Sequence, residues 1–200
     1  MNTGRYRTLG AAMIAAFALA GGSVAQAATT QAVQWNPQDT VEPVALASGS
    51  ELVMRSNSGT EVRCGTVDGN VLAPTGGDPA VAGTVDSAGN PAPPTITNCT
   101  NTLMPSATTT VTASGQWLAA ATGTTSVDIS QASATVDIGG VCEITVDNVA
   151  VPGNGWDNGT HQLTANSNES FPISESGFCD GGTSATLSGT LQLPSEVTIS

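Results

Sequence analysis

The chain has 200 residues, and its 16 acidic residues outnumber four arginines, with no lysine, to give a formal net charge of −12. A field of this sign repels the phosphates of nucleic acids and the headgroups of anionic lipids, so neither is an expected partner. Only 4% of the residues are aromatic.

The first 27 residues have the pattern of a secretory signal. Arg5 and Arg7 form a basic start, residues 9–20 are almost wholly small or apolar, and Ala25-Gln26-Ala27 resembles a cleavage site. We therefore expect a secreted or extracellular protein, with periplasmic or cell-surface retention as open alternatives. No later segment approaches the roughly 20 apolar residues of a membrane span, so none is expected in residues 28–200.

The expected mature chain divides into an N-terminal segment and one domain. Residues 28–49 are polar with a single aromatic residue, Trp35, and their order is left open. Residues 50–200 are long enough for one hydrophobic core of ordinary size. Across residues 28–200, Arg55 and Arg63 are the only cations against 16 acidic residues, which gives a formal charge of −14. Solubility in an extracellular medium is the simplest explanation of that charge.

The first part of the domain predicts a hairpin followed by a long irregular region. Residues 51–55 and 60–64 flank a polar connection at 56–59 that has the length and composition of a hairpin turn. Residues 65–94 are rich in Gly, Pro, Asp and Asn, which are typical of turns. They are interpreted as a surface loop, with a short strand from Val81 to Val85 as an option within it.

The second part predicts a series of short strands. In the stretch 142–147, Cys142, Ile144 and Val146 share one face of a two-residue period, and Gly139-Gly140 before it predicts a turn. Similar alternation recurs up to the last residues, and no segment shows a sustained helical period with caps. We predict an all-β fold of nine to eleven strands, an antiparallel β-sandwich or Greek-key barrel stabilised by disulfides.

All four cysteines follow the signal, and an even number in an exported chain predicts disulfides. Three connectivities are open. The similar separations, 35 positions from Cys64 to Cys99 and 37 from Cys142 to Cys179, favour pairing first with second and third with fourth. A zinc site is disfavoured because no Cys-x-x-Cys occurs and the single histidine, His161, has no cysteine nearby in sequence.

Two tryptophans have alternative interpretations. Trp117 and Trp156 are the largest groups that can fill the core. The alternative is an exposed aromatic platform for a sugar ring or an alkyl chain. Trp156 suits that role better because it lies in the polar loop Gly155-Trp156-Asp157-Asn158-Gly159, so Trp156, Asp157 and Asn158 are the candidate ligand contacts.

No catalytic, metal or cofactor site is predicted. A serine hydrolase would need His161 as its base, and the Gly-x-Ser-x-Gly elbow is missing. Four disulfide-bonded cysteines leave no thiol nucleophile. Sixteen acidic residues make a glycosidase pair easy to propose but impossible to identify. We expect no cofactor.

Several motifs in order resemble a family of small exported bacterial proteins, the PraB-like protein activators of alkane oxidation. The motifs cover most of residues 50–200 and are a strand at Cys64, Ile96-Thr97-Asn98-Cys99, Gly115-Gln116-Trp117-Leu118, Gly140-Val141-Cys142-Glu143-Ile144, Trp156-Asp157-Asn158-Gly159-Thr160, Gly177-Phe178-Cys179 and Ala185-Thr186-Leu187-Ser188-Gly189-Thr190. The resemblance implies a secreted helper or adhesin that acts where cells meet hydrophobic material. It brings no catalytic residues.

The sequence thus predicts a non-enzymatic secreted or cell-surface protein that mediates contact with surfaces, including accessory action on hydrophobic substrates. Its expected partners are a hydrophobic surface, a polysaccharide or the cell envelope. One alternative is an extracellular carbohydrate-binding module or hydrolase that uses an acidic, aromatic-lined groove. Another is a secreted inhibitor or effector that presents a loop from residues 65–94.

Overall fold

The computed structural model describes residues 33–72, 81–84 and 92–200, and for 81–84 only the backbone. The described part is all β, with fifteen strands and no helix long and apolar enough to cross a membrane. The strands are β1 (Trp35–Asn36), β2 (Val41–Leu46), β3 (Leu52–Ser56), β4 (Glu61–Leu72), β5 (Val81–Thr84), β6 (Thr95–Asn101), β7 (Thr109–Gly123), β8 (Ser126–Ile138), β9 (Cys142–Asp157), β10 (Gln162–Thr164), β11 (Ser170–Pro172), β12 (Ser174–Gly177), β13 (Ser184–Ser188), β14 (Thr190–Gln192) and β15 (Thr198–Ile199).

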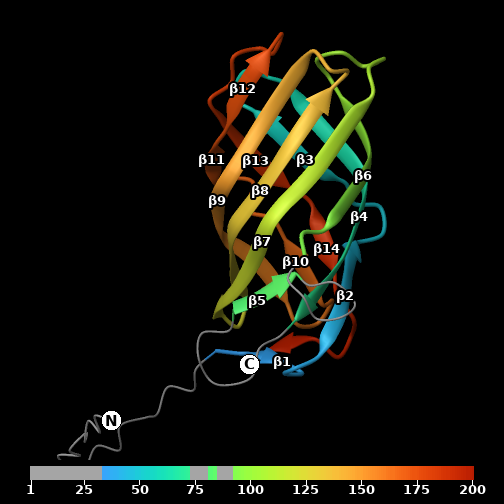
Figure 1. The fold of residues 1–200 in the computed structure, drawn as a ribbon. Coiled ribbons are helices and arrows are strands. Elements are labelled where there is room, and N and C mark those ends of the chain that lie inside the picture. Colours follow the sequence, from blue (N-terminus) through green and yellow to red (C-terminus); the bar gives the residue numbers. More distant parts are fainter. Residues whose placement is uncertain (1–32, 73–80, 85–91) are drawn as a thin grey trace, which may run out of the picture. The chain divides into compact units, whose positions relative to one another are not determined.

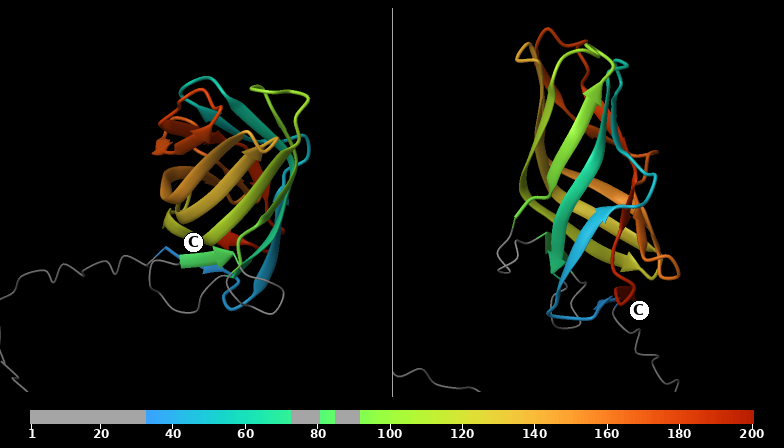
Figure 2. Two further views of the ribbon diagram at one scale, coloured as in Figure 1. Left: turned by 45° about the horizontal axis from the view of Figure 1, so that its top comes forward. Right: turned by 90° about the vertical axis from the view of Figure 1, so that its right-hand side faces the viewer.

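Eight of these strands close an antiparallel barrel. The order around it is β4-β2-β14-β10-β9-β8-β7-β6, and β6 pairs back with β4 to complete the ring. The long strands β7, β8 and β9 form one continuous side (Figure 1). On the other side, β2, β14 and β10 lie toward one end, while β3, β13 and β11 lie toward the other (Figure 2). The predicted all-β barrel class is confirmed, and the closed ring decides between the sandwich and barrel alternatives.

Three turns between paired strands lie where the sequence predicted them. Gly139 and Gly140 both have positive φ, at 62° and 69°, and connect β8 to β9. The pairing of Arg55 with Glu61 joins β3 to β4 across the polar connection at 56–59. The hairpin between β9 and β10 turns at residues 158–161. These three turns were predicted from Gly, Asn and Ser positions.

Two regions differ from the predictions. β4 continues through residues 65–72, which the composition had assigned to an irregular loop, because the turn-type Asp68-Gly69 pair lies inside a ladder with β2. The remainder of that loop, 73–80 and 85–91, lies outside the described residues. The segment 28–49 includes β2, a barrel strand, whereas the predicted domain began at residue 50. Residues 1–32, including the predicted signal, also lie outside the described residues.

Both disulfides have the predicted pairing. Cys64 and Cys99 are direct cross-strand partners on β4 and β6, with Cα atoms 4.0 Å apart. Cys142 at the start of β9 joins Cys179 after β12, with Cα atoms 5.0 Å apart. Two disulfides are consistent with an oxidising environment.

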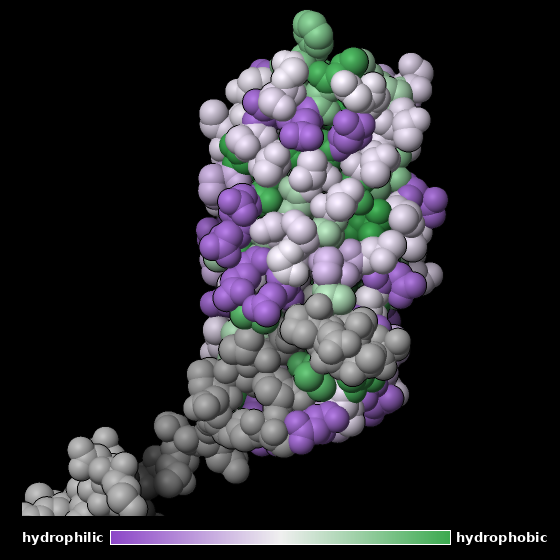
Figure 3. Space-filling model, in the orientation of Figure 1, coloured by the Kyte–Doolittle hydropathy of each residue, from purple (hydrophilic) through white to green (hydrophobic). Residues whose placement is uncertain are grey.

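The barrel is filled by two apolar clusters, one toward each end. One contains Ile144, Val136 and Phe171, and the other contains Trp35, Trp156 and Val127. Ile129 and Leu191 pack against both clusters. The outer face over β7 to β9 is mainly weakly polar or hydrophilic (Figure 3), so the apolar residues of these strands point inward. The hydrophobic space therefore lies inside the ring of strands.

Candidate functional site

Two cavities of about 70 Å³ each lie where the apolar clusters meet. They adjoin, because five residues line both: Leu52, Ile96, Trp117, Ile129 and Leu187. Every side chain that lines either cavity is apolar, so a molecule inside meets almost no polar group of the protein. We call this space the barrel interior.

The size of the barrel interior is chemically informative. An engineered apolar cavity of about 150 Å³ in another protein stays dry and binds benzene. The two cavities together approach that volume. Filling such a space restores dispersion contacts that the lining atoms otherwise lack. The barrel interior therefore matches a small apolar molecule or a short alkyl chain.

Trp117 is held against both cavities by an irregularity in β7. The pairing with β8 shifts between Gly115 and Leu118, and Trp117 itself has a φ of 47°. Its indole Nε1 donates to the carbonyl oxygens of Ser114, at 2.8 Å, and Ser133, at 3.1 Å. The polar atom is thus satisfied by the barrel wall, and the rest of the ring is free to line the cavities.

A groove of about 410 Å³ lies on the barrel wall between β6 and β7. Its lining comes from residues 93–98 and 109–113, and none of these side chains is ionisable. We call it the wall groove. Threonine hydroxyls and the Asn98 amide supply its polar groups, while Ile96 and Val111 are among its apolar ones. The wall groove is therefore neutral and amphipathic in a protein that is otherwise strongly acidic.

Trp156 is buried, and the exposed platform considered for it is incorrect. The residue is 3% exposed, and its ring lies edge-to-face on Trp35 with ring centroids 5.3 Å apart. Its Nε1 donates to Oδ1 of Asn158 at 2.6 Å. The loop around Trp156 suggested exposure, but Trp156 is still in β9 and faces the interior.

Asn158 and Asp157 fix the local backbone. The Asn158 side chain accepts from the N–H of Ile199 and donates to its carbonyl oxygen, both at 2.8 Å, and so attaches the last strand to the barrel. Asp157 accepts from the N–H of Gly159 at 2.7 Å, and this bond, with those from Thr160, lowers the pKa of its carboxyl. Ligand contact by these two residues stays a prediction.

Among the described residues, no group of three or more His, Cys, Asp and Glu side chains is placed to hold a metal ion. Nδ1 of His161 lies 2.9 Å from the carbonyl oxygen of Val197, a contact within the end of the barrel. In the part of the chain that the structure describes, no serine or threonine hydroxyl is hydrogen-bonded to the His161 ring as a nucleophile would be to its base.

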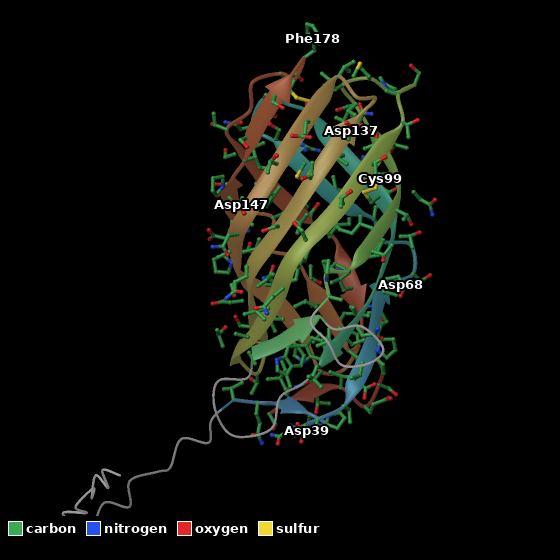
Figure 4. All side chains as sticks on the ribbon, in the orientation of Figure 1. Asp39, Asp68, Cys99, Asp137, Asp147 and Phe178 are labelled. Atoms are coloured by element: carbon green, nitrogen blue, oxygen red, sulfur yellow. A yellow bond between two sulfur atoms is a disulfide. The ribbon has the colours of Figure 1, made fainter. Side chains whose placement is uncertain are left out.

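A second feature is an apolar tip at one end of the barrel. Phe178 is 84% exposed and Val141 is 40% exposed, and the N–H of Phe178 donates to the carbonyl oxygen of Val141 at 2.7 Å. The disulfide between Cys142 and Cys179 follows each of them in sequence. Phe178 projects from the end of the molecule (Figure 4). Sequence reasoning noted Phe178 only as a family marker and did not single it out as an exposed side chain.

No protein-family model, no curated protein and no solved structure matches this chain. The site must therefore be interpreted from its own geometry.

Proposed function

We propose that this is a non-enzymatic secreted or cell-surface protein that holds a small apolar molecule in the barrel interior, as an accessory factor for hydrophobic substrates. The observation that carries the proposal is the pair of adjoining cavities with wholly apolar linings. Concave apolar sites at the core of a closed barrel are common ligand sites.

The charge of the chain supports a neutral ligand. Residues 28–200 hold 16 acidic side chains and two arginines, and both arginines are engaged with glutamates. An anionic ligand would meet repulsion from the surface and find no cation in the lining. A hydrocarbon or another uncharged apolar molecule meets neither obstacle.

The family resemblance points to the same chemistry. It implies a secreted helper or adhesin that acts where cells meet hydrophobic material, and the barrel interior gives a helper a water-excluding compartment for an apolar substrate. The disulfides suit an extracellular setting. Together with the barrel interior, these features favour a carrier or presenting protein over the carbohydrate-binding alternative, which has lost its aromatic platform at Trp156.

Benzene titration tests the proposal. Isothermal calorimetry and thermal unfolding should both show saturable binding, with the melting temperature rising as ligand exceeds the Kd. Leu187→Phe fills the space that both cavities share and should abolish binding, whereas Leu187→Met keeps the volume and should retain it. If the wild-type protein neither binds benzene nor gains stability from it at the solubility limit, the proposal is wrong.

A second candidate function, adhesion to apolar surfaces, rests on the exposed tip. Phe178→Ser should reduce adsorption of the protein to hexadecane droplets, because it removes the largest exposed apolar side chain of the described residues. Val41→Ser is the matched control, since Val41 is also an exposed apolar residue and lies on β2, away from the tip. Equal loss in both variants would argue against a specific role of the tip.

A further inference from the structure

We infer that the ligand is a neutral amphiphile, whose alkyl chain occupies the barrel interior and whose hydroxyl head lies in the wall groove. This inference rests on the proposed function and specifies the class of molecule that the site takes.

The barrel wall is incompletely paired between β6 and β7. Among the described strands, these two pair only at Cys99 and Thr109. On the same edge of β7, pairing resumes with β5, where Leu118 lies opposite Gly83. Between these points, no described strand pairs with residues 110–115 on this edge of β7, and β6 and β7 diverge (Figures 1 and 2). Within the described residues, side chains rather than a hydrogen-bonded ladder close this part of the wall.

Three side chains separate the wall groove from the barrel interior. Pro94 and Ile96 line both the groove and one cavity, while Ile96 and Val111 line both the groove and the other. Ile96 is 5% exposed and Val111 is half-buried. A rotamer change in Ile96 or Val111 breaks no ladder hydrogen bond between the described strands β6 and β7, so an alkyl chain can pass from the groove to the interior.

The lining of the wall groove selects the head. Its outward side chains offer hydroxyls from Thr97, Thr110 and Thr112 and the amide of Asn98. Among the described residues that line it, there is no arginine to neutralise a carboxylate and no carboxylate to pair with a cation. A head that both donates and accepts without carrying a charge, such as a primary alcohol, fits this lining best.

The volumes limit the chain. The barrel interior takes about as many carbon atoms as benzene has, with the remaining atoms and the head left for the wall groove. 1-Octanol is therefore a suitable probe, and octanoate is its charged counterpart of equal length. We expect 1-octanol to bind at least about tenfold more tightly than octanoate, since burying an unpaired charge is unfavourable.

The test combines these probes with groove variants in calorimetric titrations. The double variant Thr97→Val, Thr112→Val removes two hydroxyls from the wall groove. It should weaken the binding of 1-octanol about fivefold, while the affinity for benzene stays unchanged. Thr135→Val, at the position paired with Thr112 but outside the groove lining, is the control and should change neither affinity. Val111→Trp should slow 1-octanol association by obstructing the passage.

The outcomes separate this inference from the proposed function. Benzene binding with equal affinities for 1-octanol and octanoate would overturn the amphiphile inference and leave the proposed function standing. Selectivity for 1-octanol that is unaffected by the double threonine variant would place the head elsewhere and would also overturn it. Failure of benzene and 1-octanol alike to bind would overturn both.

Discussion

Ile96 on β6 and Val111 on β7 line the same wall groove and the same interior cavity, although their strands are not paired with each other at these residues. At this cavity, the contact between the outer groove and the apolar interior is thus made by two aliphatic side chains. The disulfide partner Cys99 lies three positions after Ile96, where β6 and β7 do pair. Closure of the barrel and access to its interior are therefore controlled within one short strand.

The Cys64–Cys99 disulfide should influence both stability and ligand binding. Replacing both cysteines with alanine should lower the free energy of unfolding by roughly 3 to 4 kcal/mol, from the entropy of a cross-linked loop of this length. It should also change the affinity for benzene, because β6 is held beside the wall groove by this bond. Replacing Cys142 and Cys179 with alanine should lower the free energy of unfolding, measured by urea denaturation, by a similar amount. The affinity for benzene should stay unchanged. Equal effects on binding would contradict a local role of Cys99.

Replacing Gly115, which lies at the β7 irregularity that positions Trp117, should lower the free energy of unfolding. It has a φ of 78°, and a Cβ there would lie 2.6 Å from the carbonyl oxygen of Gln131. Gly140→Ala is the matched control, since its φ is 69° with no atom within 4 Å of the added Cβ. The control should cost about 1 kcal/mol from backbone strain alone, and Gly115→Ala should cost at least about twice that because of the added clash. Equal urea midpoints for the two variants would contradict this account.

Buried Asn154 should stabilise the fold through its hydrogen bonds to the backbones of β8 and β9. Its Nδ2 donates to the carbonyl oxygens of Val127 and Val151, and its Oδ1 accepts from the N–H of Asn166. Asn154→Ala leaves these groups without partners in the core, so the free energy of unfolding should fall by about 2 to 4 kcal/mol. Asn168→Ala, at an exposed position, should change it little. A loss below 1 kcal/mol for Asn154→Ala would show that water replaces the side chain.

Glu61 should contribute to stability at neutral pH and lose that contribution in acid. Desolvation tends to raise the pKa of its carboxyl, but hydrogen bonds and charge from Arg55 and Arg63 outweigh it and hold the pKa below the ordinary value of 4.5. Because the folded-state pKa is lowered, the contribution is complete above the unfolded-state pKa and disappears as pH falls through the folded-state value. Urea midpoints of the wild type and Glu61→Gln should therefore differ at pH 7 and converge near pH 2. A constant difference would indicate a packing effect.

Much of the fold follows from local patterns. Cys142, Ile144 and Val146 face inward as their alternation predicted, and the disulfide pairing followed the spacing of the cysteines. Closure of the ring was not predictable, because the pairing of β14 with β2 joins distant segments whose composition contains no signal for register.

The irregular positions in the long strands explain most remaining differences. On β9 the inward face moves from Val146 to Val149, and later returns to Asn154 and Trp156. Asn148 accommodates the first shift with a φ of 48°, a conformation that does not require glycine and therefore leaves no clear mark in the sequence. Trp156 was considered for the surface because its polar and glycine neighbours suggested a loop, although it belongs to the core.

The candidate site was the least predictable feature. Leu187 and Ile129 each lie on the apolar face of a predicted strand, so their inward orientation could be predicted. Their meeting at one cavity with Trp117 depends on the closed ring and on the shift in β7. Such long-range geometry emerges only when the tertiary pairing is known.

The most direct test of binding in the barrel interior is a benzene titration followed by methyl NMR. The methyl resonances of Leu52, Leu187 and Ile129 should shift together and saturate, while those of the exposed Val41 and Val141 should not. Shifts confined to exposed methyl groups, or interior methyl groups that do not move up to the solubility limit, would contradict the central claim.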